Sequence, residues 1–285
     1  MAETAANPNA AQIDYWNTMA GPTWVQFQDL LDRQLEPLGV KAIEILAPRP
    51  GEAIADVGCG CGRTSLQLAE RVGAAGSVTA LDISRPMLEV ARKRAADAGL
   101  AQARFIEADA QTVRLEPARF DAVFSRFGVM FFNDPAAAFA NLRGALKPGG
   151  RLTFVCWRPY LDNLWMRAPF EAAQPLLPPT TPAEPNAPGP FAFADDARVR
   201  VILQSAGFEQ IEISPFDTAI GGSSLDDAVT LAFRVGPLGS ALREHPQAVA
   251  AVTEAVRAEL AKHVTPDGVL MPAAVWIVQA RTPEV

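Results

Sequence analysis

The sequence predicts an α/β protein with a Rossmann-like, mostly parallel sheet of seven strands, the last of them antiparallel, and with helical lid segments. Three observations predict this fold. Short apolar runs alternate with stretches of helical periodicity from about residue 52 to residue 157. The first run leads into the glycine-rich turn "DVGCGCG" at 56–62. The chain has 285 residues, of which 49% are hydrophobic, and this suffices for one large core.

The individual elements are marked by periodicity and by helix-capping residues. Leu66, Ala69 and Val72 recur at helical spacing after the turn, and Asp134 followed by Pro135 is typical of a helix start. Strands that alternate with helices of this length predict βαβ units. Strands are expected at 52–58, 77–82, 103–109, 120–127, 151–157, 209–217 and 275–281, and helices at 63–73, 84–99, 133–150, 195–208, 224–243 and 246–263.

The same pattern divides the chain into four parts. Residues 1–45 are expected to form an N-terminal helical lid and residues 46–160 a ligand-binding core. Residues 161–206 hold a proline-rich excursion and a helix; its stretch "PLLPPTTPAEPNAPGP" at 175–190 cannot form a helix or a central strand. Residues 207–285 hold the last two strands with a helical cap between them.

Composition restricts the function classes. The net charge of −7 and the pI of about 5.0 argue against non-specific nucleic-acid binding, so a small-molecule partner is expected rather than nucleic acid. The N-terminus has no signal-peptide pattern and no charge-free apolar run reaches 18 residues, so a cytoplasmic protein without a membrane span is expected. The oligomeric state stays open, with a homodimer as one option. Cys59, Cys61 and Cys156 form neither a disulfide framework nor a zinc spacing, and no metal site is expected.

The glycine-rich turn favours a nucleotide-type ligand, because glycine allows a ligand to approach the main chain. The dinucleotide fingerprint G-x-G-x-x-G, started at Gly58, needs a glycine where the chain has Arg63. The phosphate-binding pattern G-x-x-x-x-G-K-[ST] also fails, because no lysine follows. Both common phosphate-binding interpretations therefore fit poorly.

Three carboxylates point to a different ligand. Asp56, at the end of the first strand, would repel a pyrophosphate but would favour an ammonium group. Asp82, at the end of the second strand, can accept hydrogen bonds from ribose hydroxyls, and Asp109, at the end of the third, can accept one from an exocyclic amine. An amino group, a ribose and an adenine without a phosphate describe S-adenosylmethionine better than NAD or ATP.

Five ordered blocks resemble the class I S-adenosylmethionine-dependent methyltransferases, especially the bacterial group related to ubiquinone/menaquinone-biosynthesis C-methyltransferases. They are "ADVGCGCGRTS", "TALDISRPMLEVAR", "FIEADAQ", "FDAVFSRFGVMFF" and "NLRGALKPGGRLTFVCW", and they cover about residues 52–158. The resemblance implies that S-adenosylmethionine is the cofactor. It implies that Asp56 reaches the cofactor ammonium directly or through water. The other cofactor-binding residues that it implies are the loop Gly58, Cys59, Gly60 and Gly62, then Asp82 and Ile83, Asp109 and Ala110, and Ser125 and Arg126.

The resemblance implies a methyltransferase that moves a methyl group to a small, partly apolar acceptor. No catalytic residue is assigned, because a general base is needed only when the acceptor must lose a proton. His245 and His263 are interpreted as residues near helix ends, and Arg126 could orient an anionic acceptor. The candidate lid and substrate residues are Tyr15, Trp24, Phe127, Tyr160 and Trp165.

Other functions stay open. The chain could be an S-adenosylmethionine-binding regulator, or an enzyme that uses the sulfonium for a reaction other than methyl transfer. Nucleic-acid methylation is disfavoured, because Ser125-Arg126-Phe127-Gly128 stands where amino-directed DNA enzymes carry Asn-Pro-Pro-Tyr. A NAD-dependent dehydrogenase is disfavoured by Arg63 in the glycine-rich turn.

Overall fold

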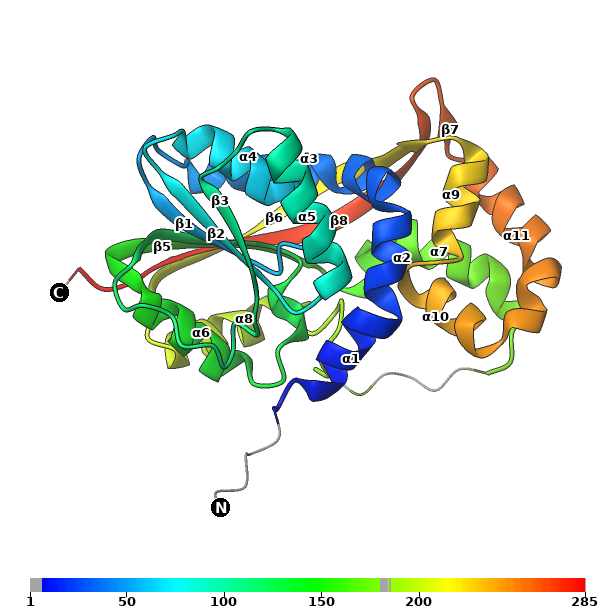
Figure 1. The fold of residues 1–285 in the computed structure, drawn as a ribbon. Helices are drawn as coiled ribbons and strands as arrows, with labels where there is room; N and C mark the ends of the chain where they lie inside the picture. Colours follow the sequence, from blue (N-terminus) through cyan, green and yellow to red (C-terminus); the bar gives the residue numbers. More distant parts are fainter. Residues whose placement is uncertain (1–6, 180–183, 185, 285) are drawn as a thin grey trace, which may run out of the picture.

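The fold is built on one sheet with the strand order β3-β2-β1-β4-β5-β8-β6, and β7 pairs with β8 beside this path (Figure 1). It is seen in a computed structural model that describes residues 7–179, 184 and 186–284. The strands β1 to β5 pair parallel with one another, and β8 is antiparallel to both β5 and β6. The strands are β1 (Ala53–Val57), β2 (Ser77–Asp82), β3 (Ala103–Glu107), β4 (Phe120–Arg126), β5 (Leu146–Trp157), β6 (Glu209–Ser223), β7 (Val264–Thr265) and β8 (Gly268–Arg281).

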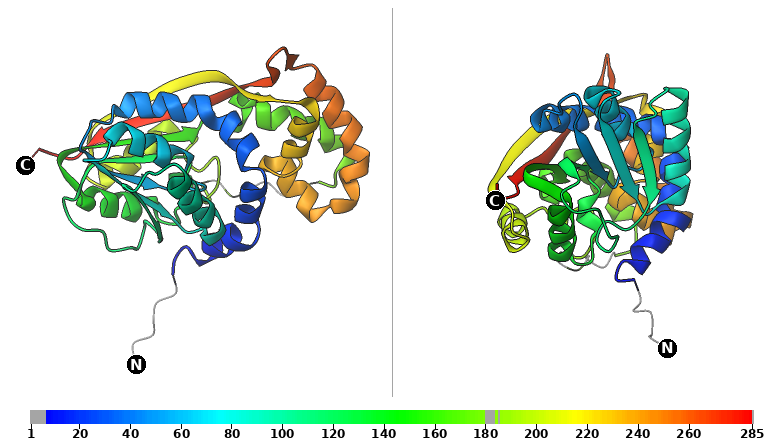
Figure 2. Two further views of the ribbon diagram at one scale, coloured as in Figure 1. Left: turned by 45° about the horizontal axis from the view of Figure 1, so that its top comes forward. Right: turned by 60° about the vertical axis from the view of Figure 1, so that its left-hand side comes forward.

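Helices cover both faces of the sheet and so complete three layers. Figure 1 shows α3, α4 and α5 on one face and α6 and α8 on the other, and the second view in Figure 2 separates these layers. The helices are α1 (Ala10–Thr18), α2 (Ala20–Gln26), α3 (Gln28–Leu46), α4 (Arg63–Val72), α5 (Arg85–Asp97), α6 (Pro135–Ala145), α7 (Leu164–Ala173), α8 (Asp196–Ser205), α9 (Leu225–Ala232), α10 (Gly236–Glu244) and α11 (Val249–Ala261).

The main core lies between these layers. Every residue of β1 is buried, as expected for a central parallel strand that is covered on both faces. Leu38 and Ile43 of α3 belong to the same buried cluster as Ile54 and Phe124. Each such side chain contributes about 1.5–3 kcal/mol through its removal from water. The helix α3 is therefore fastened to the sheet, whereas α1 has no buried hydrophobic residue.

The strand order reverses beside β1, whose neighbours are β2 on one side and β4 on the other. The connections leave β1 and β4 toward opposite faces, so a crevice opens at the carboxyl ends of these strands. Ligands of open α/β sheets bind in such a crevice.

A helical cap is inserted between the two antiparallel strands. The long pairing of β6 with β8 extends past the parallel strands and carries α9, α10 and α11, which α7 joins (Figures 1 and 2). This cap has its own apolar cluster, which includes Leu238, Val252, Val256, Leu260 and Met271. The cap thus closes one side of the crevice with a separately packed unit.

The predicted fold class and the antiparallel last strand are confirmed, but several details differ. The sheet has eight strands rather than seven, because the two-residue β7 adds an extra one. The "KPGG" segment, expected to end a helix, belongs to β5, which begins at Leu146. The helix expected over 224–243 is interrupted between α9 and α10, where Gly236 adopts a φ of 71°.

The N-terminal and proline-rich segments also differ in detail. The N-terminal segment is divided into three helices, and the junction of α1 and α2 falls within the stretch "NTMAGP" at 17–22. A short 3-10 turn at Gln174–Leu176 opens the proline-rich stretch, and residues 180–183 and 185 lie outside the described residues. Among the helices of the described ranges, none combines the length and hydropathy needed to cross a membrane.

Candidate functional site

A cavity of about 840 Å³ occupies the crevice. Its walls come from the carboxyl ends of the parallel strands, from the N-terminal helices and from the cap. Its size is within the range of small-molecule and cofactor sites. The sequence-predicted residues that line it are Gly58, Cys59, Gly60, Asp82, Ile83, Asp109, Ala110, Arg126, Tyr15, Trp24, Phe127 and Trp165.

The glycine loop owes its glycines to positive φ angles and to close contact with neighbouring protein atoms. Gly58, Gly60 and Gly62 adopt φ angles of 69°, 54° and 84°. A Cβ on Gly58 would lie 2.5 Å from the Cα of Gly128, and one on Gly60 would lie 2.8 Å from Met87 Cε. The side-chain positions therefore face protein, while the main chain of Gly58 and Gly60 lines the cavity.

Asp82 connects the loop to the end of β2. Its Oδ2 accepts a hydrogen bond from the Gly60 N–H at 2.7 Å, and its Oδ1 accepts one from the Ser84 N–H at 2.8 Å. Burial raises the pKa of Asp82, while these main-chain N–H groups act in the opposite direction. A carboxylate has about four lone-pair positions, so acceptor capacity is left over for a ligand in the cavity.

Asp109 is buried at the start of the loop after β3, where the N-terminal segment reaches it. Its Oδ2 accepts hydrogen bonds from Asn9 Nδ2 at 2.9 Å and from Thr112 Oγ1 at 3.1 Å. Asn9 is itself 4% exposed, and its Oδ1 accepts from the Asn133 N–H at 2.9 Å. Asn9 thus fastens the start of the chain across the ends of two strands.

The helix α1 is also tied to the turn after β2. Asn17 Nδ2 donates to the Ile83 carbonyl at 2.8 Å, and Ser84 Oγ donates to the Trp16 carbonyl at 2.8 Å. A Cβ on Gly21 would overlap that Trp16 carbonyl oxygen, so glycine is required for this close approach. Residues of the N-terminal helices line the cavity, and these polar contacts hold the helices there.

Four expected site residues lie outside the cavity wall. Ser125 Oγ donates to the Val57 carbonyl at 2.7 Å and joins β4 to β1 instead of facing the cavity. Gly62 begins α4, and its side-chain position faces Ala91 and Phe105. Tyr160 stacks edge-to-face on Phe191 with a centroid distance of 5.6 Å.

Asp56 is the fourth of these residues, and it lies beneath the loop. It is fully buried, and its Oδ2 accepts from Thr64 Oγ1 at 2.9 Å and from Ser65 Oγ at 2.6 Å. Burial raises the pKa of Asp56 to about 6, although both hydroxyl groups favour the charged form. Its Oδ1 has no hydrogen-bond partner among the described residues. Asp56 is not among the described residues that line the cavity, so its expected contact with the cofactor ammonium, directly or through water, stays a prediction.

Charged groups from α3 lie at the other side of the loop. Arg126 is 3.9 Å from Asp32 and Arg94 is 2.8 Å from it, all three with little exposure. Arg63 forms a bidentate pair with Glu36 at 2.8 and 2.9 Å. Burial lowers the pKa of Arg126, against the attraction of Asp32. Asp32 and Arg126 both line the cavity and so offer it one negative and one positive group.

Aromatic side chains form the wall toward the cap. Phe127 stacks on Trp157 with a centroid distance of 4.2 Å and an interplanar angle of 9°, and Trp157 lies 5.1 Å from Trp165. Phe127 adopts a φ of 64°, which is strained for a bulky residue. Such strained backbone conformations are concentrated at functional sites. On the N-terminal side, Trp16 contacts Trp24 and Phe131 edge-on.

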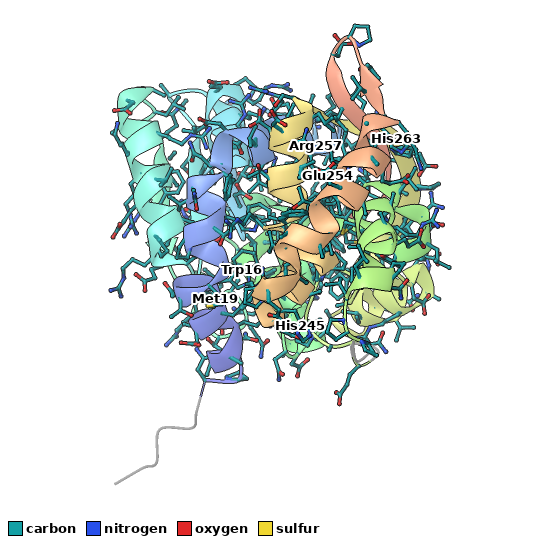
Figure 3. All side chains as sticks on the ribbon, turned by 90° about the vertical axis from the view of Figure 1, so that its right-hand side faces the viewer. Trp16, Met19, His245, Glu254, Arg257 and His263 are labelled. Carbon is teal, nitrogen blue, oxygen red and sulfur yellow. The ribbon has the colours of Figure 1, made fainter. Side chains whose placement is uncertain are left out.

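Among the described lining residues there is neither a histidine nor a lysine. His245 caps the end of α10 and His263 follows α11, and both are labelled on the cap side in Figure 3. The described residues hold no cluster of three or more potential metal ligands. The three cysteines are free and buried, and burial raises the pKa of Cys61 to about 12.

Sequence reasoning missed several residues of the wall. Asn9, Asp32, Trp157, Arg234 and Arg243 all line the cavity. Trp157 ends a predicted strand, as Asp82 does, so its position at the carboxyl edge was a usable signal. The other four come from the flanking helices and turns, whose docking onto the sheet leaves no local pattern.

Comparison with known proteins identifies the domain that holds this site. Residues 54–150 match the family model described as a methyltransferase domain. The chain is 34% identical over 152 residues to the aklanonic acid methyltransferase of Streptomyces sp. strain C5, which is 53% of this chain and 64% of that protein. It is 29% identical over 178 residues to a ubiquinone/menaquinone biosynthesis C-methyltransferase of Stutzerimonas stutzeri, with 59% and 70% covered. The chain thus spans slightly less than two thirds of the first of these relatives.

Solved structures share the fold at low identity. A putative methyltransferase from Bacillus halodurans matches 86% of this chain and 98% of its own, with a TM-score of 0.56 and 19% identity. A [4+2]-cyclase, SpnF, matches 94% of this chain and 98% of its own, with a TM-score of 0.56 and 18% identity. The same fold is therefore found in proteins that are named for different reactions.

Proposed function

The chain has a class I S-adenosylmethionine-dependent methyltransferase domain, and from this premise we propose that it transfers the methyl group of S-adenosylmethionine to a small, partly apolar acceptor. The single observation that carries the proposal is one cavity lined by the Gly58–Gly60 main chain, Asp82 and Asp109, without a lysine among its described residues. This set suits a nucleoside with an amino acid attached.

We assign the nucleoside to the ends of β2 and β3. The free lone pairs of Asp82 would accept hydrogen bonds from the ribose hydroxyls, since its other positions are occupied by the Gly60 and Ser84 N–H groups. Ile83 would contact the adenine face. Asp109 and Ala110 would meet the adenine edge, where the carboxylate of Asp109 would accept from the exocyclic amine.

We assign the amino-acid part of the cofactor to the glycine loop and α3. Asp32 and Arg126 are held 3.9 Å apart and present opposite charges to the cavity. Such a pair is complementary to an α-ammonium and an α-carboxylate. Asp56 would favour the ammonium from beneath the loop, either through an intervening water or through its charge alone. Asp32 is an addition to the sites that the sequence suggested.

The chemistry that the site must supply is modest. S-adenosylmethionine, when bound, supplies a methyl group that is already activated by a sulfonium. The protein residues need to hold an acceptor in line with that methyl group and to exclude water, and such positioning can contribute about 7–11 kcal/mol. The aromatic residues Phe127, Trp157 and Trp165 would form the acceptor wall. The described lining residues include no histidine or lysine, so a protein base, where the acceptor needs one, would come from a carboxylate such as Glu244 or from Tyr15.

The first experiment measures cofactor binding and turnover separately. S-adenosylhomocysteine is titrated into the purified protein by calorimetry. The protein is then incubated with methyl-labelled S-adenosylmethionine and a library of small aromatic and aliphatic acceptors, and labelled product and S-adenosylhomocysteine are quantified. The proposal predicts binding and acceptor-dependent formation of both products. If S-adenosylhomocysteine does not bind, the cofactor assignment is wrong.

A second candidate function rests on the similarity to the cyclase structure, which extends over 94% of this chain. In this alternative, the cavity binds the cofactor but catalyses another reaction, or the chain acts as a regulator. Tight binding of S-adenosylmethionine without any formation of S-adenosylhomocysteine would favour it. The same library serves as the test, with the consumption of each acceptor followed independently of methyl transfer.

We further propose that the acceptor is not a nucleic acid, because the net charge is −7 and a phosphate backbone requires cationic contacts. A gel-shift experiment at low salt tests this, since any binding driven by phosphate contacts is strongest there. A homodimer is one possible oligomeric state of this protein. Light scattering after gel filtration measures the molar mass and so tests this proposal.

A further inference from the structure

The cap side of the cavity carries two exposed arginines that form no ion pair with the described residues. Arg234 lies in the turn between α9 and α10, and Arg243 lies near the end of α10; both line the cavity. No carboxylate of the described residues lies within 4 Å of either guanidinium. We infer that the acceptor is a planar aromatic molecule with an anionic carboxylate, held by Arg234 and Arg243; this inference rests on the proposed function.

The other two arginines of the cavity are different. Arg63 is paired with Glu36 at 2.8 Å, and Arg126 faces Asp32 at 3.9 Å. Each of these two arginines has a carboxylate within 4 Å, whereas neither cap arginine has one among the described residues. Arg243 donates only to neutral oxygens, namely Ser240 Oγ at 2.8 Å, the Arg234 carbonyl at 3.3 Å and Tyr15 Oη at 3.3 Å. These contacts hold its guanidinium in place without using its charge.

The position of Arg243 couples it to the lid. Its hydrogen bond to Tyr15 joins the cap helix α10 to α1 across the outer side of the cavity, and Figures 1 and 3 show these helices beside each other. The acidic lining residue on this wall of the described chain is Glu244, next to Arg243. Two arginines against one glutamate leave this wall with a net positive charge, which favours an anionic group.

The aromatic wall determines the shape of the rest of the molecule. Phe127, Trp157 and Trp165 follow one another from the end of β4 to α7, with centroid distances of 4.2 and 5.1 Å. Trp165 and Met166 line both the main cavity and a smaller one of about 50 Å³. A flat ring system can lie against such a wall by stacking. Gly236, close to Arg234 in the sequence, lies against Met166, the neighbour of Trp165. The anion-binding site formed by the two arginines therefore adjoins the aromatic wall.

The test uses a matched pair of probes, anthraquinone-2-carboxylate and anthraquinone-2-carboxamide, which differ in charge but hardly in shape. Each is titrated into the full chain saturated with S-adenosylhomocysteine, and binding is followed by tryptophan fluorescence and calorimetry. We expect the carboxylate to bind at least tenfold more tightly than the carboxamide. Arg234→Gln and Arg243→Gln should each reduce that preference severalfold and leave carboxamide binding nearly unchanged.

Two further variants separate charge from shape. Trp165→Leu should weaken both probes by a similar factor, because it removes stacking area without changing charge. Arg257→Gln is the matched control, since Arg257 lies on α11 and pairs with Asp226 away from the cavity (Figure 3). It should leave both affinities unchanged. Melting temperatures confirm that each variant folds.

The possible results are distinguishable. Equal affinity for the two probes, or an unchanged preference in both arginine variants, overturns the anionic assignment. Failure of both probes to bind overturns the aromatic assignment. Either failure leaves the proposed function intact provided that S-adenosylhomocysteine binds in the same samples, whereas failure of S-adenosylhomocysteine to bind contradicts the proposed function itself. Arg243→Gln also removes the hydrogen bond to Tyr15 and could change binding by shifting α1. Arg234→Gln serves as the check, because among the described residues Arg234 forms no hydrogen bond to Tyr15.

Discussion

Gly58 and Gly128 face each other with their main chains in contact. A Cβ on Gly58 would lie 2.5 Å from the Gly128 Cα, and one on Gly128 would lie 2.5 Å from the Val57 carbonyl oxygen. The turn after β1 and the turn after β4 therefore interlock at the floor of the cavity. Ser125 Oγ reinforces the contact by donating to Val57 and accepting from the Gly128 N–H at 3.2 Å.

Gly58→Ala is expected to destabilise the protein by about 2–5 kcal/mol, as the sum of left-handed strain and an overlap with Gly128. Chemical denaturation monitored by circular dichroism measures it. Gly99→Ala is the matched control, because Gly99 has a similar φ of 68° but open space around its Cβ position. It should cost only the strain, about 1–2 kcal/mol. Equal losses in the two variants would show that the contact with Gly128 contributes nothing.

Asp82→Ala is expected to weaken S-adenosylhomocysteine binding by at least tenfold. The substitution removes the proposed ribose acceptor and also frees the Gly60 N–H, which shapes the loop. Calorimetric titration provides the measurement. Asp97→Ala serves as the control, since Asp97 is exposed on α5 and pairs only with Lys93. An unchanged dissociation constant in Asp82→Ala would refute the ribose assignment.

Asn9→Ala is expected to loosen the lid without unfolding the core. It removes the buried hydrogen bonds to Asp109 and from Asn133, each of which contributes about 0.5–1.5 kcal/mol. We expect faster release of S-adenosylhomocysteine in stopped-flow fluorescence and faster proteolytic cleavage within α1. Thr18→Ala, which removes only an exposed hydrogen bond to Asp14, should leave both rates unchanged. If the two variants release S-adenosylhomocysteine and are cleaved within α1 at the same rates, Asn9 does not hold the N-terminal helices in place.

Asp56 is expected to make stability depend on pH. Its pKa of about 6 in the folded protein is raised above the ordinary aspartate pKa of 3.8, so the folded state binds the proton more tightly. Its contribution to stability is therefore present below about pH 4 and is lost as the pH rises through 6. Asp56→Asn should be more stable than the wild type at pH 7–8 by about 2–3 kcal/mol, and this difference should shrink toward pH 4.

The measurement for Asp56 is the free energy of unfolding in urea at a series of pH values between 4 and 8. The result is the difference in the free energy of unfolding between wild type and Asp56→Asn at each pH. Glu36 and Glu107 have lowered pKa values, so they make both proteins more stable as the pH rises, and the difference removes this shared effect. A difference between wild type and variant that does not vary with pH would contradict the assignment. Asp56→Asn should also weaken S-adenosylhomocysteine binding if the carboxylate attracts the cofactor ammonium.

The sequence predicts those parts of the fold whose residues interact locally. The alternation of apolar runs and amphipathic helices identifies β1 to β5 with their helices, because each element has its own periodicity and caps. The carboxylates Asp82 and Asp109 could be placed in one site because parallel strands end at one edge. The cap was predicted only as two helices, since its packing against α7 depends on contacts between residues far apart in the chain.

The sequence by itself determined that a glycine turn and two strand-end carboxylates meet at a crevice, since strand direction and turn chemistry are encoded over a few residues. Only the tertiary structure decided which atoms face that crevice. It turned Asp56 and Ser125 inward to hydroxyl and carbonyl partners, and it brought Asn9, Asp32 and Arg243 to the wall from distant segments. The physical reason is that helix docking depends on packing and on pairing of buried polar groups across the whole molecule, which no short stretch of sequence contains.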